Sequence, residues 1–121
     1  MGIELNSREP IYLQIIAYMK RKIASGELKK GERVLSVREY ASEIKVNPNT
    51  IQKVYSELEK QGLIYTQRGI GKFVTEDEGT VSNLGQELFN ETIDKFIEDS
   101  KALGFTREKI LAIISERYKE E

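Results

Sequence analysis

A dense row of hydrogen-bonding side chains lies near the middle of the chain. Between Asn49 and Ser56, every position outside an apolar repeat carries an amide, a hydroxyl or an ammonium group. Amide side chains pair bidentately with adenine, an ammonium favours guanine or phosphate, and a threonine contacts a thymine methyl group or a phosphate. On one helical face, these groups have the chemistry to recognise base pairs in the DNA major groove. The alternative interpretation is an ordinary helix face that contacts only solvent. The candidates are Asn47, Asn49, Thr50, Gln52 and Lys53.

Cations flank this row on both sides. Arg38 lies in the first turn of a predicted helix, where the helix dipole disfavours a cation, and this invites a functional explanation. After the row, Arg68-Gly69-Ile70-Gly71-Lys72 places two cations at a predicted hairpin tip, where glycines permit the close backbone approach that the minor groove requires. The alternative for each cation is a solvated residue without a role. The further DNA-binding candidates are Arg38, Lys45, Arg68, Gly69 and Lys72.

Charge is divided unequally along the chain, although the 121 residues sum to a formal net charge of −1. Residues 1–75 hold 13 Lys and Arg against 8 Asp and Glu, and residues 76–121 hold 6 against 12. The first segment therefore carries +5 and the second −6. A basic segment favours a polyanionic partner such as nucleic acid, which repels an acidic segment. We therefore expect the second segment to lie away from the nucleic acid.

The chain contains neither Cys nor His. This composition excludes disulfides, thiolate nucleophiles and Ser-His-Asp catalysis, and it excludes nearly all zinc, copper and haem sites. Carboxylates alone could act as acids or hold Mg²⁺, but Glu87, Glu91, Asp94 and Glu98 share one helical face, as a solvated stripe does. We expect no enzymatic activity, cofactor or metal. Because no apolar run approaches the roughly 20 residues that cross a membrane, we also expect a cytoplasmic protein with no membrane partner.

Apolar positions recur at helical spacing in three stretches of the first segment, at residues 10–25, 37–44 and 48–61. Ser36 precedes the second stretch and fits a capping box with the Glu three residues later. Asn47 precedes the third stretch and is followed by a Pro suited to the first helical turn. These local signals predict three helices.

The last two of these helices are separated by a very short connection, which predicts a helix-turn-helix unit. Many such turns contain glycine, whereas this one has Lys45-Val46, so we expect Lys45 to adopt a mildly unfavourable conformation. After Gly62, the stretches LIYTQ and KFV are rich in β-branched and aromatic residues, and they flank the turn 68–71. They predict a two-stranded hairpin, a wing that follows the three helices.

The last third of the chain predicts two helices after a polar hinge at residues 76–82. One helix is expected over residues 83–103 and another from Thr106 to about residue 118. Apolar residues in the first of them alternate at four- and three-residue steps, the spacing of a coiled coil. Helices with this much apolar surface need a partner, which a second copy of a short chain can supply. The expected dimer interface comprises Phe89, Ile93, Phe96, Ile97, Leu103, Ile110 and Ile114.

The chain from Pro10 to Val74 resembles the GntR-type bacterial transcription regulators, and among them the small YtrA-like branch. The resemblance is carried by PIYLQI, SGELKKGERVLSVREYA, VNPNTIQKVYSELEKQGLI and RGIGKFV. Leu35 and Tyr40 depart from the family pattern, which usually has Pro and Leu there. The resemblance implies a winged helix-turn-helix in which an Arg on the second helix, the start of the third helix and the wing tip bind an operator. Those positions are Arg38, Asn47, Asn49, Thr50, Gln52, Lys53, Arg68 and Gly69.

Together, these features predict a mostly helical α+β fold with a winged helix-turn-helix at residues 1–75, a hinge at 76–82 and a helical dimerisation segment at 83–121. The predicted function is a homodimeric repressor on an inverted-repeat operator in double-stranded DNA, and the resemblance implies control of a transporter operon. One alternative stays open, a winged helix that binds another protein. No effector is identified. Since the last 46 residues leave little room to enclose a small molecule, we expect any effector site at the dimer interface.

Overall fold

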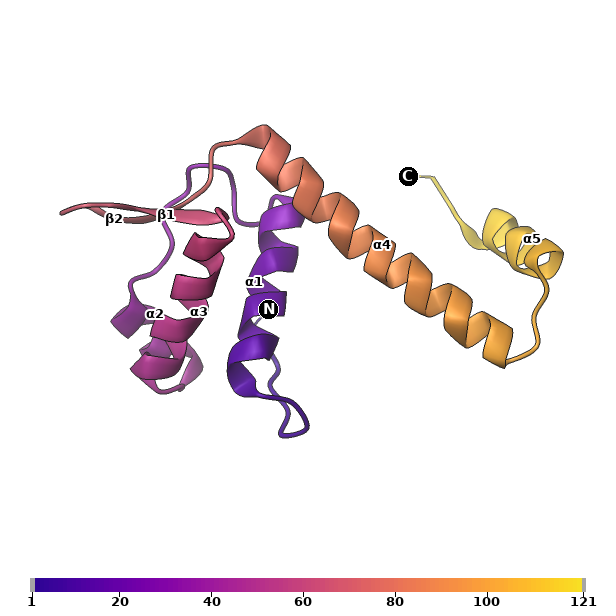
Figure 1. Cartoon of the computed structure of the whole chain (residues 1–121), viewed down its shortest axis with the longest axis horizontal. Helices are drawn as coiled ribbons and strands as arrows, with labels where there is room; N and C mark the ends of the chain where they lie inside the picture. The colour runs from indigo at the N-terminus through magenta and orange to yellow at the C-terminus, as the bar shows by residue number, and fades with distance from the viewer. Residues whose placement is uncertain (1, 121) are drawn as a thin grey trace. The chain divides into compact units, whose positions relative to one another are not determined.

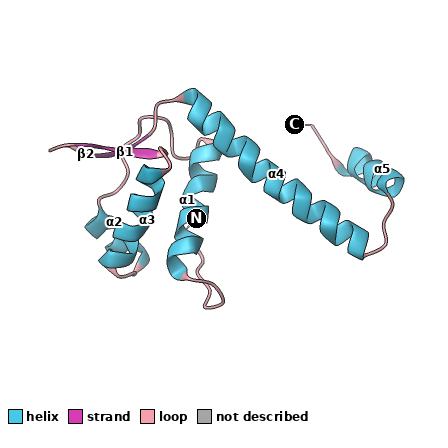
Figure 2. Ribbon diagram, in the orientation of Figure 1, coloured by secondary structure: helices cyan, strands magenta, loops and turns pink. Residues whose placement is uncertain are grey.

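The computed structural model describes residues 2–120, and the chain forms two compact units with their boundary between Gln86 and Glu87. Along the described residues, three helices come first, then a two-stranded sheet, then two more helices (Figure 1). Helices account for most of the described residues (Figure 2). The predicted mostly helical α+β fold is confirmed.

Helices α1 (Ile11–Ser25), α2 (Val37–Ile44) and α3 (Pro48–Lys60) build the first unit, with α3 packed against both of the others. Each helix contributes the apolar stripe that its sequence spacing predicts. Burial of these stripes is the main favourable contribution to the stability of the unit. The buried side chains are Ile15, Ile16, Met19 and Ile23 on α1, Tyr40 and Ala41 on α2, and Ile51, Val54, Tyr55 and Leu58 on α3.

Local capping determines where α2 and α3 begin. The backbone N–H of Glu39 donates to Ser36 Oγ at 3.1 Å, and the backbone N–H of Ser36 donates to Glu39 Oε1 at 2.9 Å, which confirms the capping box. The backbone N–H of Asn49 donates to Asn47 Oδ1 at 2.7 Å, which confirms Asn47 as the cap of α3. Between these helices Lys45 has φ 58° and ψ 51°, the unfavourable left-handed conformation expected there.

Strands β1 (Ile64–Gln67) and β2 (Gly71–Val74) pair antiparallel and form the predicted wing. The segment before α2 also joins this sheet, because Arg33 forms an antiparallel bridge with Phe73. Residues 26–33 contain two glycines and no alternating pattern, so their sequence does not indicate this pairing. The extra pairing comes from β2, whose outer edge is open to another strand.

Helix α4 (Glu78–Ala102) begins five residues before the predicted start at Asn83, so residues 78–82, expected within a hinge, are helical. The reason is a cap, since the backbone N–H of Thr80 donates to Asp77 Oδ2 at 3.0 Å. Hydrogen bonds from the Thr80 hydroxyl and backbone N–H also lower the pKa of Asp77. Gly79, of a residue type that weakens helices, is accommodated in the first helical turn.

Helix α5 (Arg107–Arg117) is capped as predicted, because the backbone N–H of Lys109 donates to Thr106 Oγ1 at 3.2 Å. Gly104, between α4 and α5, has φ 84°, a conformation that favours glycine. No residue of α5 is buried. Within residues 2–120, no helix combines the length and the apolar character needed to span a membrane.

Candidate nucleic-acid interface

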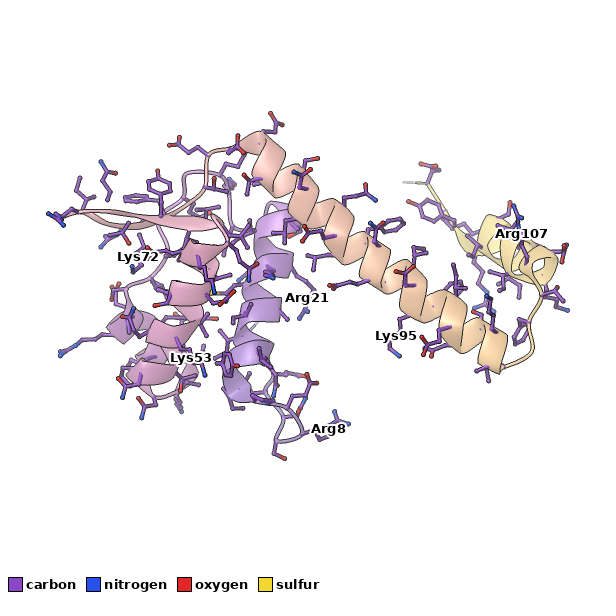
Figure 3. All side chains as sticks on the ribbon, in the orientation of Figure 1. Arg8, Arg21, Lys53, Lys72, Lys95 and Arg107 are labelled. Carbon is purple, nitrogen blue, oxygen red and sulfur yellow. The ribbon has the colours of Figure 1, made fainter. Side chains whose placement is uncertain are left out.

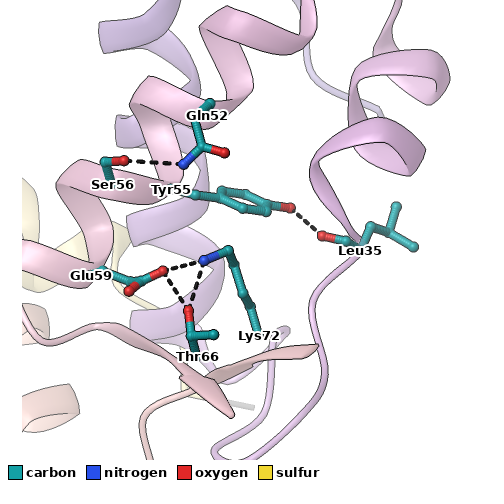
Figure 4. A network of polar contacts seen from close by, with 7 residues as sticks. All are labelled: Leu35, Gln52, Tyr55, Ser56, Glu59, Thr66 and Lys72. Atoms are coloured by element: carbon teal, nitrogen blue, oxygen red, sulfur yellow. Dashed lines mark hydrogen bonds and ion pairs between the residues drawn. The ribbon is translucent and has the colours of Figure 1, made fainter. Parts of the chain in front are cut away.

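Helix α3 places its apolar and polar residues on opposite faces. Ile51 has no exposed surface, whereas Asn49, Gln52 and Lys53 are exposed. The amide nitrogen of Gln52 donates to Ser56 Oγ at 3.3 Å, so these two side chains lie along one line of the exposed face (Figure 4). Because packing against α1 and α2 holds the buried face, the direction of the polar face is set by the core.

Asn47 and Thr50 lie at the leading end of α3 and differ from the rest of the row. The side-chain oxygen of Asn47 caps the helix, which leaves its amide nitrogen as a donor for an outside partner. Thr50 is half-buried and shares a concave surface with Ile11 and Tyr12 of α1. The fold therefore brings the first turn of α1 beside the leading end of α3.

Two tyrosines behind the polar row hold the helix-turn-helix together. The Tyr55 hydroxyl donates to the backbone carbonyl of Leu35 at 2.7 Å (Figure 4). The ring of Tyr55 stacks on that of Tyr40, with ring centres 6.3 Å apart and planes inclined by 12°. Burial raises the pKa of Tyr40 to about 12 and raises that of Tyr55 as well. Leu35 and Tyr40, the two positions that depart from the family pattern, therefore both contact Tyr55.

Arg38 is exposed on the first turn of α2, and no other residue within 2–120 forms an ion pair or hydrogen bond with its side chain. The neighbouring carboxylate of Glu39 is engaged in the capping box instead. Hydrogen bonds from Ser36, from its backbone first, lower the pKa of Glu39. The Arg38 guanidinium is thus available to an outside partner. Lys45, in the turn between α2 and α3, is exposed as well.

The wing tip carries Arg68 and Gly69 in a tight turn. The backbone N–H of Ile70 donates to the carbonyl of Gln67 at 2.9 Å. Gly69 has φ 80°, which favours glycine, and Arg68 is exposed beside it. The turn therefore presents a cation next to a backbone without a side chain, an arrangement suited to a narrow groove.

Lys72, the second predicted cation of the wing, is engaged inside the domain. Its ammonium forms an ion pair with Glu59 of α3 and donates to Thr66 Oγ1 at 2.7 Å (Figure 4). The Thr66 hydroxyl donates to Glu59 Oε1 at 2.8 Å. Hydrogen bonding from Lys72 holds the pKa of Glu59 below its ordinary value. Lys72 therefore ties the wing to α3, a role that sequence spacing does not indicate.

Two further contacts beside the interface have no signal in the sequence. Arg33 packs over Gly71, where an added Cβ would lie 2.8 Å from Arg33 Nε. Tyr12, whose position fits the helical apolar spacing of residues 10–25, has the Lys53 ammonium 3.7 Å from its ring centre. Each contact joins residues from different elements, so only the fold brings the partners together.

The predicted dimer residues all lie in the second unit. Among residues 87–120, only Ser100 is buried. Apolar side chains are therefore left at the surface of this unit, including Phe89 of α4 at 58% exposed and Leu103, just after α4, at 75%. The exposed members of the predicted set are Phe89, Phe96, Ile97, Leu103 and Ile114, and the half-buried members are Ile93 and Ile110.

The structure has three features of the winged helix-turn-helix class of DNA-binding transcription regulators. These are an exposed polar helix, a preceding helix with a free arginine, and a wing with a cation at its tip. Residues 11–74 match the family described as bacterial regulatory proteins, gntR family. The chain belongs to this family.

Similarity to relatives extends well beyond the family match. The chain is 39% identical over 115 residues to the HTH-type transcriptional repressor YtrA of Bacillus subtilis (strain 168), covering 94% of this chain and 88% of YtrA. A GntR family transcriptional regulator from Listeria monocytogenes has a TM-score of 0.87 and 38% identity, covering 94% of this chain and 100% of that one. The DNA-binding domain of AraR in complex with operator ORE1 has a TM-score of 0.53 and 27% identity, covering 62% of this chain and 94% of that one.

Proposed function

We propose that this protein is a homodimeric repressor that places α3 of each protomer in the major groove of an inverted-repeat operator. The observation that carries the proposal is the polar face of α3, where Asn49 and Gln52 are exposed while the opposite face is buried. A helix held by packing on one side presents the same donors and acceptors each time it docks. Discrimination between base pairs requires such a constant pattern.

The cations around α3 supply the electrostatic part of the proposed DNA contact, most of which does not depend on the base sequence of the DNA. Arg38 on α2, Lys45 in the turn and Arg68 at the wing tip are all exposed. We assign Arg38 to a base edge or phosphate, Lys45 to a phosphate, and Arg68 with Gly69 to the minor groove. If each protomer neutralises roughly four phosphates, log K should fall against log salt with a slope of about −7 for the dimer.

A second copy of the chain is the proposed partner of the second unit. Phe96 is 41% exposed on α4, and Phe89 and Ile97 of the same helix are exposed as well. A two-fold dimer relates two α3 helices by the same symmetry, so the operator is an inverted repeat with half-sites about 34 Å apart. Occupying a promoter in this way would block transcription, which makes repression the proposed outcome.

Selection of bound sequences from a random duplex pool at about 150 mM salt tests binding and symmetry in one experiment. The proposal expects an enriched inverted repeat. Enrichment of an isolated half-site would contradict the dimer. A folded protein that enriches nothing would contradict DNA recognition and favour the alternative, a winged helix that binds another protein.

Arg38→Ala tests whether α2 takes part in sequence recognition. If Arg38 contacts a base, the variant should lose about 1–3 kcal/mol of binding free energy on the selected operator and less on non-specific DNA. Equal losses on both duplexes would restrict Arg38 to a phosphate. Arg107→Ala is the matched control, because Arg107 is exposed on α5 in the acidic second unit and should not affect binding.

A further inference from the structure

Lys53 does not project freely into solvent from α3. Its ammonium lies 3.7 Å from the centre of the Tyr12 ring in the first turn of α1, and Figure 3 labels Lys53 where α3 faces that helix. A cation at this distance over an aromatic face is attracted by the ring quadrupole. Tyr12 is half-buried, so packing restrains the ring. The contact holds Lys53 on the side of α3 that faces α1.

The contact with Tyr12, and not the position of Lys53 around the helix axis, draws its ammonium away from the centre of the polar face. With 3.6 residues per turn, Lys53 and Ser56 lie about equally close to the middle of the exposed face, and Lys53 is on the side of half-buried Thr50, which faces α1. In a major groove, the middle of a recognition helix meets base edges, and its flanks meet the sugar-phosphate walls. Lys53 therefore lies where a phosphate would pass.

A concave surface at this flank has room for such a group. Its volume is about 340 Å³, and its lining consists of Ile11, Tyr12, Asn49, Thr50 and Lys53. None of these five residues carries a negative charge, and the amide, hydroxyl and ammonium groups among them are hydrogen-bond donors. This chemistry suits a phosphodiester oxygen.

The geometry points to Tyr12 as a DNA-positioning residue, whose ring holds the Lys53 ammonium at the flank of α3 so that Lys53 binds a backbone phosphate instead of a guanine. This inference rests on the proposed DNA-binding function and deepens it. An ammonium has three N–H donors, so it can keep the ring on one side while donating to a phosphate on another. Holding the long side chain in place beforehand reduces the ordering that binding requires.

A double-mutant cycle tests the coupling between the two residues. Wild type, Tyr12→Leu, Lys53→Ala and the double variant are titrated by fluorescence anisotropy against the selected operator and a mixed-sequence duplex of about three helical turns, at about 50–200 mM salt. Tyr12→Leu should weaken binding about two- to five-fold on both duplexes. Lys53→Ala should weaken binding and reduce the salt slope by about 0.9 for each protomer. In the Lys53→Ala background, Tyr12→Leu should have no further effect.

Two control variants separate positioning from folding. Tyr12→Phe keeps the ring and should bind both duplexes as the wild type does. Tyr18→Leu removes another tyrosine of α1, whose ring centre lies 5.1 Å from Lys22 Nζ, and should leave DNA binding unchanged. Circular dichroism of each variant checks that the helices are intact.

Three results would overturn the inference. They are an equal effect of Tyr12→Leu with and without the Lys53 ammonium, tighter binding by Tyr12→Leu, and a loss confined to the operator. The last would indicate that Lys53 contacts a base. A folded wild-type protein that binds neither duplex would instead overturn the proposed function, so the two failures are distinguishable.

Discussion

Replacing Lys45 with Gly should stabilise the protein while weakening its binding to DNA. Lys45 has φ 58° and ψ 51°, and within residues 2–120 it is the one non-glycine residue with a positive φ. The left-handed conformation costs a residue with a Cβ about 1–2 kcal/mol. Glycine's greater freedom in the unfolded chain offsets about 0.4–1 kcal/mol of the relief. Lys45→Gly should therefore raise the free energy of unfolding by about 0.5–1 kcal/mol.

The assay combines thermal unfolding with binding to the selected operator. Lys45→Ala is the matched control, because it removes the ammonium but retains the Cβ and the strain. The Gly variant should melt about 2–6 °C above the Ala variant. If Lys45 contacts a phosphate, both variants should bind more weakly than wild type, with the salt slope reduced by about 0.9 for each protomer. Equal melting temperatures would refute the strain argument, and wild-type binding by both variants would remove Lys45 from the interface.

Tyr55→Phe removes the hydrogen bond to the Leu35 carbonyl and should lower the free energy of unfolding, measured in urea, by about 1–2 kcal/mol. An unchanged midpoint would contradict that role. The Lys72 contact lowers the pKa of Glu59, so its stabilisation is present above the unfolded pKa and is lost as the pH falls through the folded pKa. Wild type should therefore exceed Glu59→Gln in stability at pH 7, and the difference should shrink in acid; a constant difference would refute the linkage. Phe96→Glu should give monomers in sedimentation, whereas a variant that stays dimeric would place the interface elsewhere.

The helix-turn-helix could be predicted because its signals are local. Each cap lies within three residues of the group that it satisfies, as Ser36 does for Glu39 and Asn47 for Asn49. The strained backbone at Lys45 could also be predicted from nearby residues alone, because a tight turn without glycine leaves few backbone conformations. The start of α4 was harder to predict, because a capping Asp and a helix-breaking Gly compete within three residues.

Contacts between elements could not be predicted in the same way. By spacing, Lys72 is a cation of the wing, but the fold brings Glu59 of α3 against it. By spacing, Tyr12 belongs to an apolar stripe, but Lys53 covers its ring. A periodic pattern indicates which face a side chain occupies and leaves open which group of another element meets it there. Roles that depend on such meetings need the structure.

Helix α5 has 11 residues, and none of them is buried. Isolated helices shorter than about 12–15 residues are marginal in water, because too few hydrogen bonds offset nucleation. If the proposed dimer covers α5, folding of this end and self-association become one step that depends on protein concentration. The amount of subunit made by the cell would then determine the lifetime of each chain. Scarce chains would expose a frayed end to proteases, and abundant ones would protect each other.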